Sequence, residues 1–195
     1  MTELTRSALL SRALVAGGAI ATGGFVAAHL ARAADSDEDL AWVRLGVNLE
    51  FLKTVFSTRA RRTGFFTGAD AGSLERGQDA DQAHLDKFVE TLTSQGRTSI
   101  DGNDLDVVFP KTAFNSRDNV AALGSRLAIL GVRSYLGASA GVASPTLRIL
   151  FAQVATNEGE QMSFFQGLRG HAIGPAFPYG YDIARAADEL AVYLP

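Results

Sequence analysis

The chain has 195 residues, and 47% of them are hydrophobic, which is enough for one domain with its own core. Its net charge of -3 comes from interspersed acidic and basic residues. This balance argues against nucleic acid as a partner, because phosphate binding needs a basic face. The absence of cysteine excludes disulfides, thiolate metal sites and a cysteine nucleophile.

The N-terminal residues 1–33 predict a secretory signal peptide or an N-terminal membrane anchor. Arg6 and Arg12 precede an uncharged run rich in Ala and Gly, and "ARA" (31–33) has the small residues of a signal-peptidase site. We therefore expect export to the periplasm or the outside of the cell, with a cut after this triplet. The alternative is an uncleaved tether through residues 13–31, although this run is short for a span of about 20 apolar residues.

After residue 34 the sequence predicts helices, with no alternating segment long enough for a strand. Four segments have apolar residues at helical spacing, and they are 38–61, 73–94, 116–139 and 144–168. We expect Ser73 to cap the second helix, and Ser144 to cap the fourth with Pro145 at its first position. The fold class expected from these helices is an all-α antiparallel four-helix bundle over residues 34–170.

The connections between the helices differ in length. The second and third helices are separated by a long connection, residues 95–115, which is compatible with a crossover along the bundle. The C-terminal tail, residues 171–195, contains Gly and Pro and then a predicted short helix over 183–193. We expect this helix to pack on the outside of the bundle.

Several polar residues fall on faces that should be buried. Glu50 lies within the apolar stripe of the first helix, Asp81 and His84 are three positions apart on the second, and Glu158 and Gln161 repeat this spacing on the fourth. Burying ionised carboxylates is costly unless they are paired or bind a cation. Three acids and a histidine from three helices therefore predict either a metal site or a hydrogen-bonded polar network.

Five segments also carry a family resemblance through their order and spacing. They are "VNLEFLKTVF" (47–56), "DQAHLDKF" (81–88), "LGVRSYLGA" (130–138), "NEGEQMSFFQGL" (157–168) and "YDIARAADELA" (181–191). Together they resemble the ferritin-like domain proteins of exported bacterial type, which are related to plant desiccation-related proteins. The resemblance implies a ferritin-like bundle with a dimetal site. It places the metal ligands at Glu50, Asp81, His84, position 128, Glu158 and position 161.

This chain departs from the family pattern at the second metal. Ala128 stands where the family has a Glu, Gln161 stands where it has a His, and Asp81 replaces a longer Glu. A neutral amide is a poor iron ligand, so we do not expect a two-iron centre that activates oxygen. The residues of the first metal remain, and they are Glu50, Asp81, His84 and Glu158. They are expected to hold either one iron, manganese or zinc ion or no metal at all, as a vestigial polar network.

Two other features carry less weight. "GASAG" (137–141) has the spacing of a serine nucleophile motif, but that motif needs a preceding strand, and here it ends a predicted helix. Tyr135 lies on the inner face of the third helix and could lie near the polar residues, although an aromatic at that spacing usually packs in the core.

The sequence leaves two functional hypotheses. The first is a non-catalytic structural or interaction protein of the cell envelope, with another copy of the chain or an envelope protein as its partner. The second is a metal-binding redox protein that uses the surviving half of the site. As an enzyme, it would be a ferritin-like metal-dependent oxidoreductase.

Overall fold

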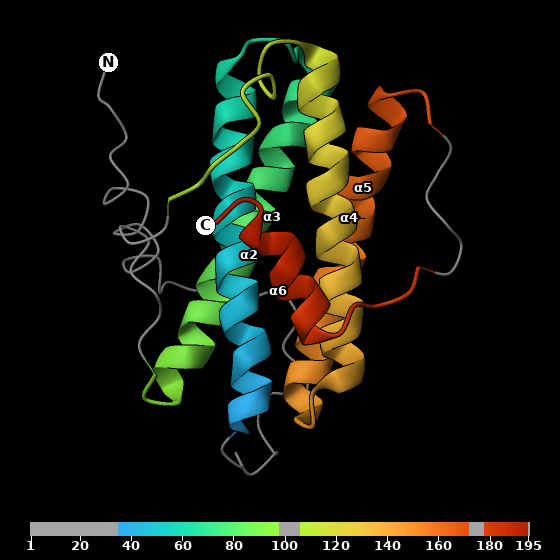
Figure 1. Cartoon of the computed structure of the whole chain (residues 1–195). Coiled ribbons are helices and arrows are strands. Elements are labelled where there is room, and N and C mark those ends of the chain that lie inside the picture. Colours follow the sequence, from blue (N-terminus) through green and yellow to red (C-terminus); the bar gives the residue numbers. More distant parts are fainter. Residues whose placement is uncertain (1–34, 98–105, 172–177, 195) are drawn as a thin grey trace.

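The computed structural model describes residues 35–97, 106–171 and 178–194, which form five helices and no strand. The helices are α2 (Asp37–Arg62), α3 (Gly68–Ser94), α4 (Arg117–Gly141), α5 (Pro145–Leu168) and α6 (Ile183–Ala191) (Figure 1). The predicted all-α bundle with a short C-terminal helix is thus confirmed. None of the described helices has both the length and the apolar character that a membrane span requires. The predicted signal or anchor, residues 1–33, lies outside the described residues.

Serine caps fix the starts of α4 and α5. The Ser116 hydroxyl accepts a hydrogen bond from the backbone N–H of Asn119 at 3.1 Å, which confirms the predicted start of the third bundle helix. The Ser144 hydroxyl accepts from the N–H of Leu147 at 3.5 Å, and Pro145 follows at the first helical position, where its missing N–H leaves no bond unmade.

The predicted start of the second bundle helix is wrong. Helix α3 begins at Gly68, with Thr67 as its N-cap residue, and Ser73 lies inside the helix. Asp70 falls in the first turn, where the helix dipole favours an acid. Its carboxylate also forms an ion pair with Arg117 of α4, at 2.7 Å. This contact between distant segments stabilises a first turn that the local sequence, rich in glycine, does not predict.

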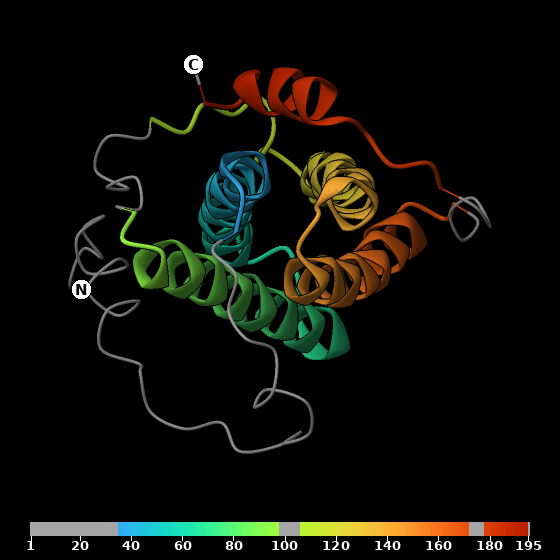
Figure 2. The same ribbon diagram turned by 90° about the horizontal axis from the view of Figure 1, so that it is seen from below.

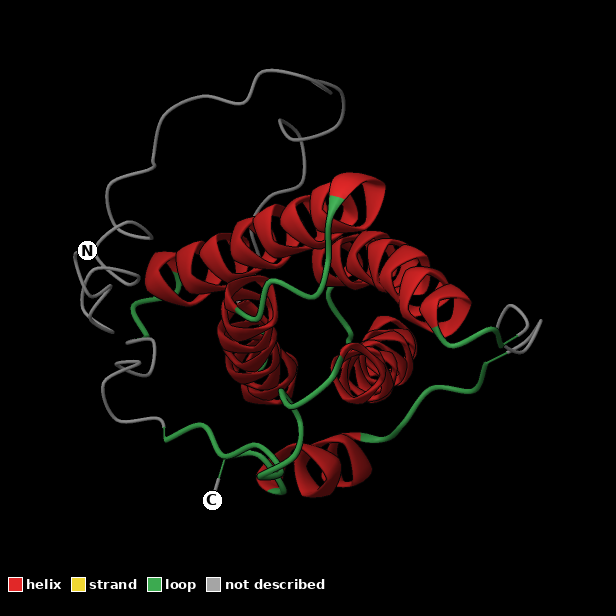
Figure 3. Ribbon diagram, turned by 90° about the horizontal axis from the view of Figure 1, so that it is seen from above, coloured by secondary structure: helices red, strands yellow, loops and turns green. Residues whose placement is uncertain are grey.

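The four long helices form two antiparallel hairpins, α2 with α3 and α4 with α5 (Figure 1). The described part of the long connection, residues 106–116, returns along the bundle, so that α3 and α4 run in the same direction. This confirms the predicted crossover. The views along the bundle place the four helices around one core, with α6 outside, next to α2 and α4 (Figures 2 and 3).

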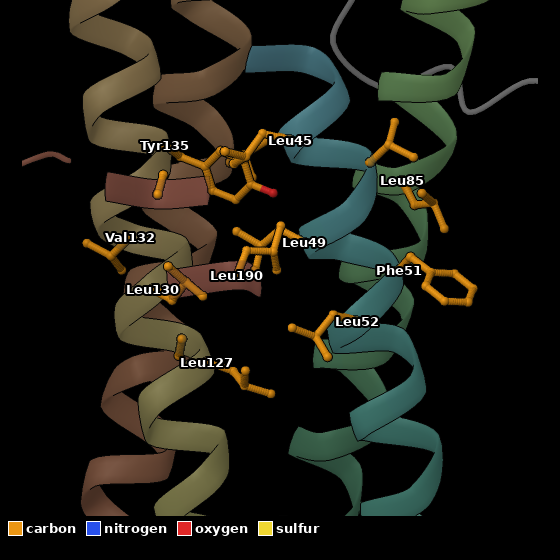
Figure 4. Packing of buried hydrophobic residues seen from close by; sticks show 14 of the residues in the cluster. Leu45, Leu49, Phe51, Leu52, Leu85, Leu127, Leu130, Val132, Tyr135 and Leu190 are labelled. Carbon is orange, nitrogen blue, oxygen red and sulfur yellow. The ribbon is translucent and has the colours of Figure 1, made fainter. Parts of the chain in front are cut away.

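The core is built from leucine and aromatic side chains that all the helices supply. Figure 4 shows Leu49 and Leu52 of α2 facing Leu127 and Leu130 of α4, while Leu190 of α6 covers the same seam. Burial of each such leucine stabilises the fold by about 1.5–3 kcal/mol. Three aromatic rings from three helices stack within the bundle, with centroids 5.5 to 6.0 Å apart. They are Phe88 of α3, Tyr135 of α4 and Phe151 of α5.

The tail before α6 lies directly on the backbone of α4. A Cβ atom added at Gly137 would lie only 1.7 Å from the carbonyl oxygen of Tyr181, so glycine is what lets the two backbones meet. The N–H of Tyr181 donates to the carbonyl of Arg133 at 2.8 Å. The Arg133 guanidinium in turn stacks 4.3 Å from the centroid of the Tyr179 ring. These contacts fix where α6 crosses the bundle.

Candidate functional site

The polar residues that the sequence places on inward faces meet in the core. We call Glu50, Asp81, His84 and Glu158 the buried cluster. Each offers one ligand atom, and these four atoms all lie within 4.8 Å of one another. The three carboxylates are fully buried, and the His84 side chain is 16% exposed. In donor type and spacing the buried cluster is compatible with a metal ion.

A lysine that the sequence analysis did not identify points into the buried cluster. The Lys53 ammonium nitrogen lies 2.7 Å from Asp81 Oδ1 and 3.4 Å from Glu50 Oε2. It also donates a hydrogen bond to Glu158 Oε1. One ammonium group therefore contacts all three buried carboxylates.

Lys53 reaches the buried cluster because it follows Glu50 by three residues, which places both side chains on one face of α2. That spacing is the sequence signal for it. The usual expectation for a lysine is that its chain extends along the apolar surface to bring the ammonium into water. Here only 3% of the side chain is exposed, so the charge stays inside the bundle.

The charged forms of Lys53 and Glu50 are favoured by their neighbours. Burial alone would lower the pKa of Lys53, but the carboxylates of Asp81, Glu158 and Glu50 outweigh burial and raise it. Burial alone would raise the pKa of Glu50, but the Lys53 ammonium, His84 and Tyr135 outweigh it, and that pKa is lowered. Glu50 of the buried cluster thus forms an ion pair with Lys53, three residues further along α2.

The other two carboxyl groups shift in the opposite direction. Burial raises the pKa of Asp81 despite the opposing effect of Lys53. Burial, with added repulsion from Glu50 and Asp81, raises the pKa of Glu158 well above its ordinary value. Both shifts favour the protonated, uncharged forms of these acids, which reduces the negative charge that one ammonium group must balance.

Neutral side chains around the buried cluster hold two of its carboxylates in place. The Tyr135 hydroxyl, fully buried on α4, donates a hydrogen bond to Glu50 Oε1. The Gln161 amide nitrogen donates to Asp81 Oδ1 at 2.6 Å. Gly131 leaves room for Glu158, because a Cβ atom there would lie 2.3 Å from Glu158 Oε2. The sequence allowed two roles for Tyr135, packing in the core or a place in the site, and the residue has both.

The family resemblance implies two further metal ligands, at positions 128 and 161, and neither residue there provides one. Ala128 is buried on α4 and has no ligand atom to offer. Gln161 faces Asp81, but through its amide N–H, which is a hydrogen-bond donor and not a metal ligand. Neither residue therefore supplies the ligand that the resemblance implies for a second metal.

Comparison with known protein families shows which family the chain belongs to. The family described as "Ferritin-like domain" matches residues 38–171, from the first turn of α2 to just beyond the end of α5. The chain belongs to this ferritin-like domain family. Its match covers all four long helices and every residue of the buried cluster. No curated protein matches the chain in a sequence comparison.

The ferritin-like fold implies a dimetal centre at this place in the bundle, and the residues present do not fit one. Ala128 and Gln161 stand at the two positions where the resemblance implies ligands for the second metal. The Lys53 ammonium lies within hydrogen-bond distance of two carboxylates of the buried cluster and close to the third, which is where a first metal ion would need to bind. An ammonium and a metal cation cannot both bind these oxygen atoms, because their like charges repel and they would occupy the same space.

Removal of the Tyr135 hydroxyl should destabilise the fold through Glu50. We expect Tyr135→Phe to lower the free energy of unfolding by about 1.5–3 kcal/mol, because a buried carboxylate loses a hydrogen bond while the ring remains. Urea denaturation measures this change. Tyr179→Phe is the matched control: its hydroxyl accepts a hydrogen bond from Arg133, but the residue is 63% exposed, so loss of the hydroxyl should have little effect. Equal stability of both variants would contradict the role given to the Tyr135 hydroxyl.

The raised pKa of Glu158 predicts a stability that decreases as the pH rises. The folded chain keeps a proton that the unfolded chain releases above 4.5, its ordinary value. This contribution to stability is fully present below that value and is lost as the pH rises through the folded pKa. The raised pKa of Asp81 acts in the same direction. The lowered pKa of Glu50 has the opposite effect: it stabilises the fold above 4.5, and this contribution is lost only as the pH falls below that value.

We therefore expect the free energy of unfolding to decrease as the pH rises above 4.5, the ordinary value for Glu158. Glu158→Gln, which has no proton to release, should show a smaller decrease. Glu160→Gln, at an exposed position of the same helix, should retain the wild-type dependence. Urea denaturation at several pH values distinguishes them, and identical pH profiles for all three chains would show that Glu158 is not protonated in the fold.

Proposed function

We propose that this chain is a non-catalytic ferritin-like scaffold of the cell envelope, acting as a structural or interaction protein. The observation that carries the proposal is the position of the Lys53 ammonium among three buried carboxylates. It neutralises the polar core from within the chain. The missing ligands at Ala128 and Gln161 support the same conclusion, because oxygen activation at a dimetal site needs both metals.

The proposed location rests on the N-terminal residues 1–33, with their arginines, uncharged run and small-residue triplet. Export with a cut after Ala33 would release the bundle into the periplasm or the medium. Retention of residues 13–31 would instead tether it to the membrane. Intact-mass measurement of the protein from fractionated cells separates these cases, and an uncut chain in the cytoplasm would contradict both.

The alternative function is a protein that binds one iron, manganese or zinc ion. The convergence of four ligand atoms within 4.8 Å is the observation in its favour. Against it stands Lys53, whose pKa is raised by the same carboxylates that would bind the metal. A metal ion would have to displace a charged group that is already hydrogen-bonded.

Elemental analysis of the wild-type chain tests the proposed function. The chain is incubated with iron(II), manganese(II) or zinc(II), dialysed and analysed, and oxygen uptake is followed during the iron(II) incubation. We expect no retained metal and no uptake above that of buffer. About one metal ion per chain would favour the alternative, and about two with oxygen uptake would establish the dimetal oxidase that the scaffold proposal excludes.

A further inference from the structure

Lys53 raises the question of what the buried cluster would bind without it. Two features of a metal site remain around the ammonium. The acids and the imidazole come from three helices and converge. Their surroundings keep them in position, with Tyr135 donating to Glu50 and Gln161 donating to Asp81. Outer hydrogen bonds of this kind orient metal ligands in proteins.

Two carboxylate oxygens in the buried cluster also lack a hydrogen-bond partner among the described residues. They are Asp81 Oδ2 and Glu158 Oε2, and both residues are fully buried. The same holds for Nδ1 of His84, which lies 3.5 Å from Glu50 Oε2. Buried polar atoms without a partner are unfavourable, and a cation that displaces any proton on them would satisfy several of them together.

We propose that Lys53 is the single residue that keeps the buried cluster from binding a metal, and that its replacement by a small neutral residue opens a site for one divalent transition-metal ion. This inference rests on the proposed function, in which the ammonium is the resident cation. One oxygen-rich site with an imidazole suits zinc, manganese or iron. The stoichiometry is limited to one because Ala128 and Gln161 supply no further ligands.

The charge balance favours the exchange. Removal of the ammonium leaves three buried carboxyl groups without a cation, which the fold can tolerate only by protonation or by binding one. A divalent ion restores the lost charge and takes the vacated volume. Binding of the metal therefore stabilises the folded state of the variant, whereas in the wild type it must compete with a tethered ammonium.

The test uses zinc(II), which has no redox chemistry, and the full chain carrying Lys53→Ala. After incubation and dialysis we expect about one zinc ion per chain and a rise in Tm on adding zinc. The wild type should show neither. Lys87→Ala, at an exposed lysine of α3, is the matched control and sets the background of surface-bound zinc. Lys53→Ala/His84→Ala, which removes one ligand, should retain much less zinc than Lys53→Ala.

A second variant covers the case in which Lys53→Ala does not fold without metal. Lys53→Gln keeps amide donors for the carboxylates while removing the charge, and both variants are refolded with and without zinc. Recovery of helical circular dichroism only with zinc would support the proposal as strongly as retained metal. Failure of both variants to bind zinc or to be stabilised by it overturns the inference and leaves the scaffold function standing. Zinc bound to the wild type in the same amount would overturn both.

Discussion

Lys53→Met should lower the free energy of unfolding by about 3–5 kcal/mol at neutral pH, because it leaves the carboxylates of the buried cluster without their ammonium partner. Methionine nearly fills the space of the lysine chain, so the loss reports the charge and its hydrogen bonds. Urea denaturation measures it. The loss should become smaller as the pH is lowered, since each acid of the buried cluster that takes up a proton no longer needs a cation.

The matched control for this prediction is Lys87→Met. Lys87 pairs with Glu90 at 2.9 Å on the surface of α3, with about half of its side chain exposed. Exposed pairs of this kind contribute about 0–1 kcal/mol. If Lys53→Met lowered the free energy of unfolding no more than the control does, the ammonium would not be the group that stabilises the buried carboxylates.

Gly137→Ala should release the tail and α6 from the bundle. Its Cβ would meet the backbone of Tyr181, with the carbonyl oxygen at 1.7 Å, and neither backbone can rotate away as a side chain can. We expect a loss of about 1–3 kcal/mol in the free energy of unfolding, together with faster hydrogen exchange in α6. Limited proteolysis between α5 and α6 gives a second measurement.

Gly159→Ala is the control with the opposite sign. A Cβ at Gly159 would meet nothing within 4 Å, and the residue lies inside α5. Alanine there should stabilise the helix by up to about 1 kcal/mol, because it restricts the unfolded chain. A tail that stays protected in Gly137→Ala would mean that the two backbones can separate without loss of the α6 contact.

Most of the fold follows from local signals in the sequence. Helical spacing of apolar residues predicted the four long helices, and Ser116 and Ser144 predicted two of their starts. The start of α3 could not be predicted in this way. Ser73 is a good cap by residue type, but the pairing of Asp70 with Arg117 depends on a crossover that brings distant segments together.

The site was predictable only as far as side-chain direction follows from spacing. Glu50, Asp81, His84 and Glu158 fall on inward faces by their periodicity, and the structure brings them together. Lys53 shares a face with Glu50, but the same position would let its chain extend to solvent. Whether the ammonium stays buried or reaches solvent depends on how many carboxylates surround it. Those carboxylates come from three helices packed together, so no single sequence segment reveals their number.

A cation that is part of the chain changes what the protein needs from its surroundings. The folded fraction of a metal-dependent bundle varies with the free metal concentration of its compartment. The Lys53 ammonium is attached to α2, so its local concentration is set by the covalent chain and is the same everywhere. This protein should reach its native state equally well in metal-starved and metal-rich surroundings, without a delivery protein and unaffected by chelators.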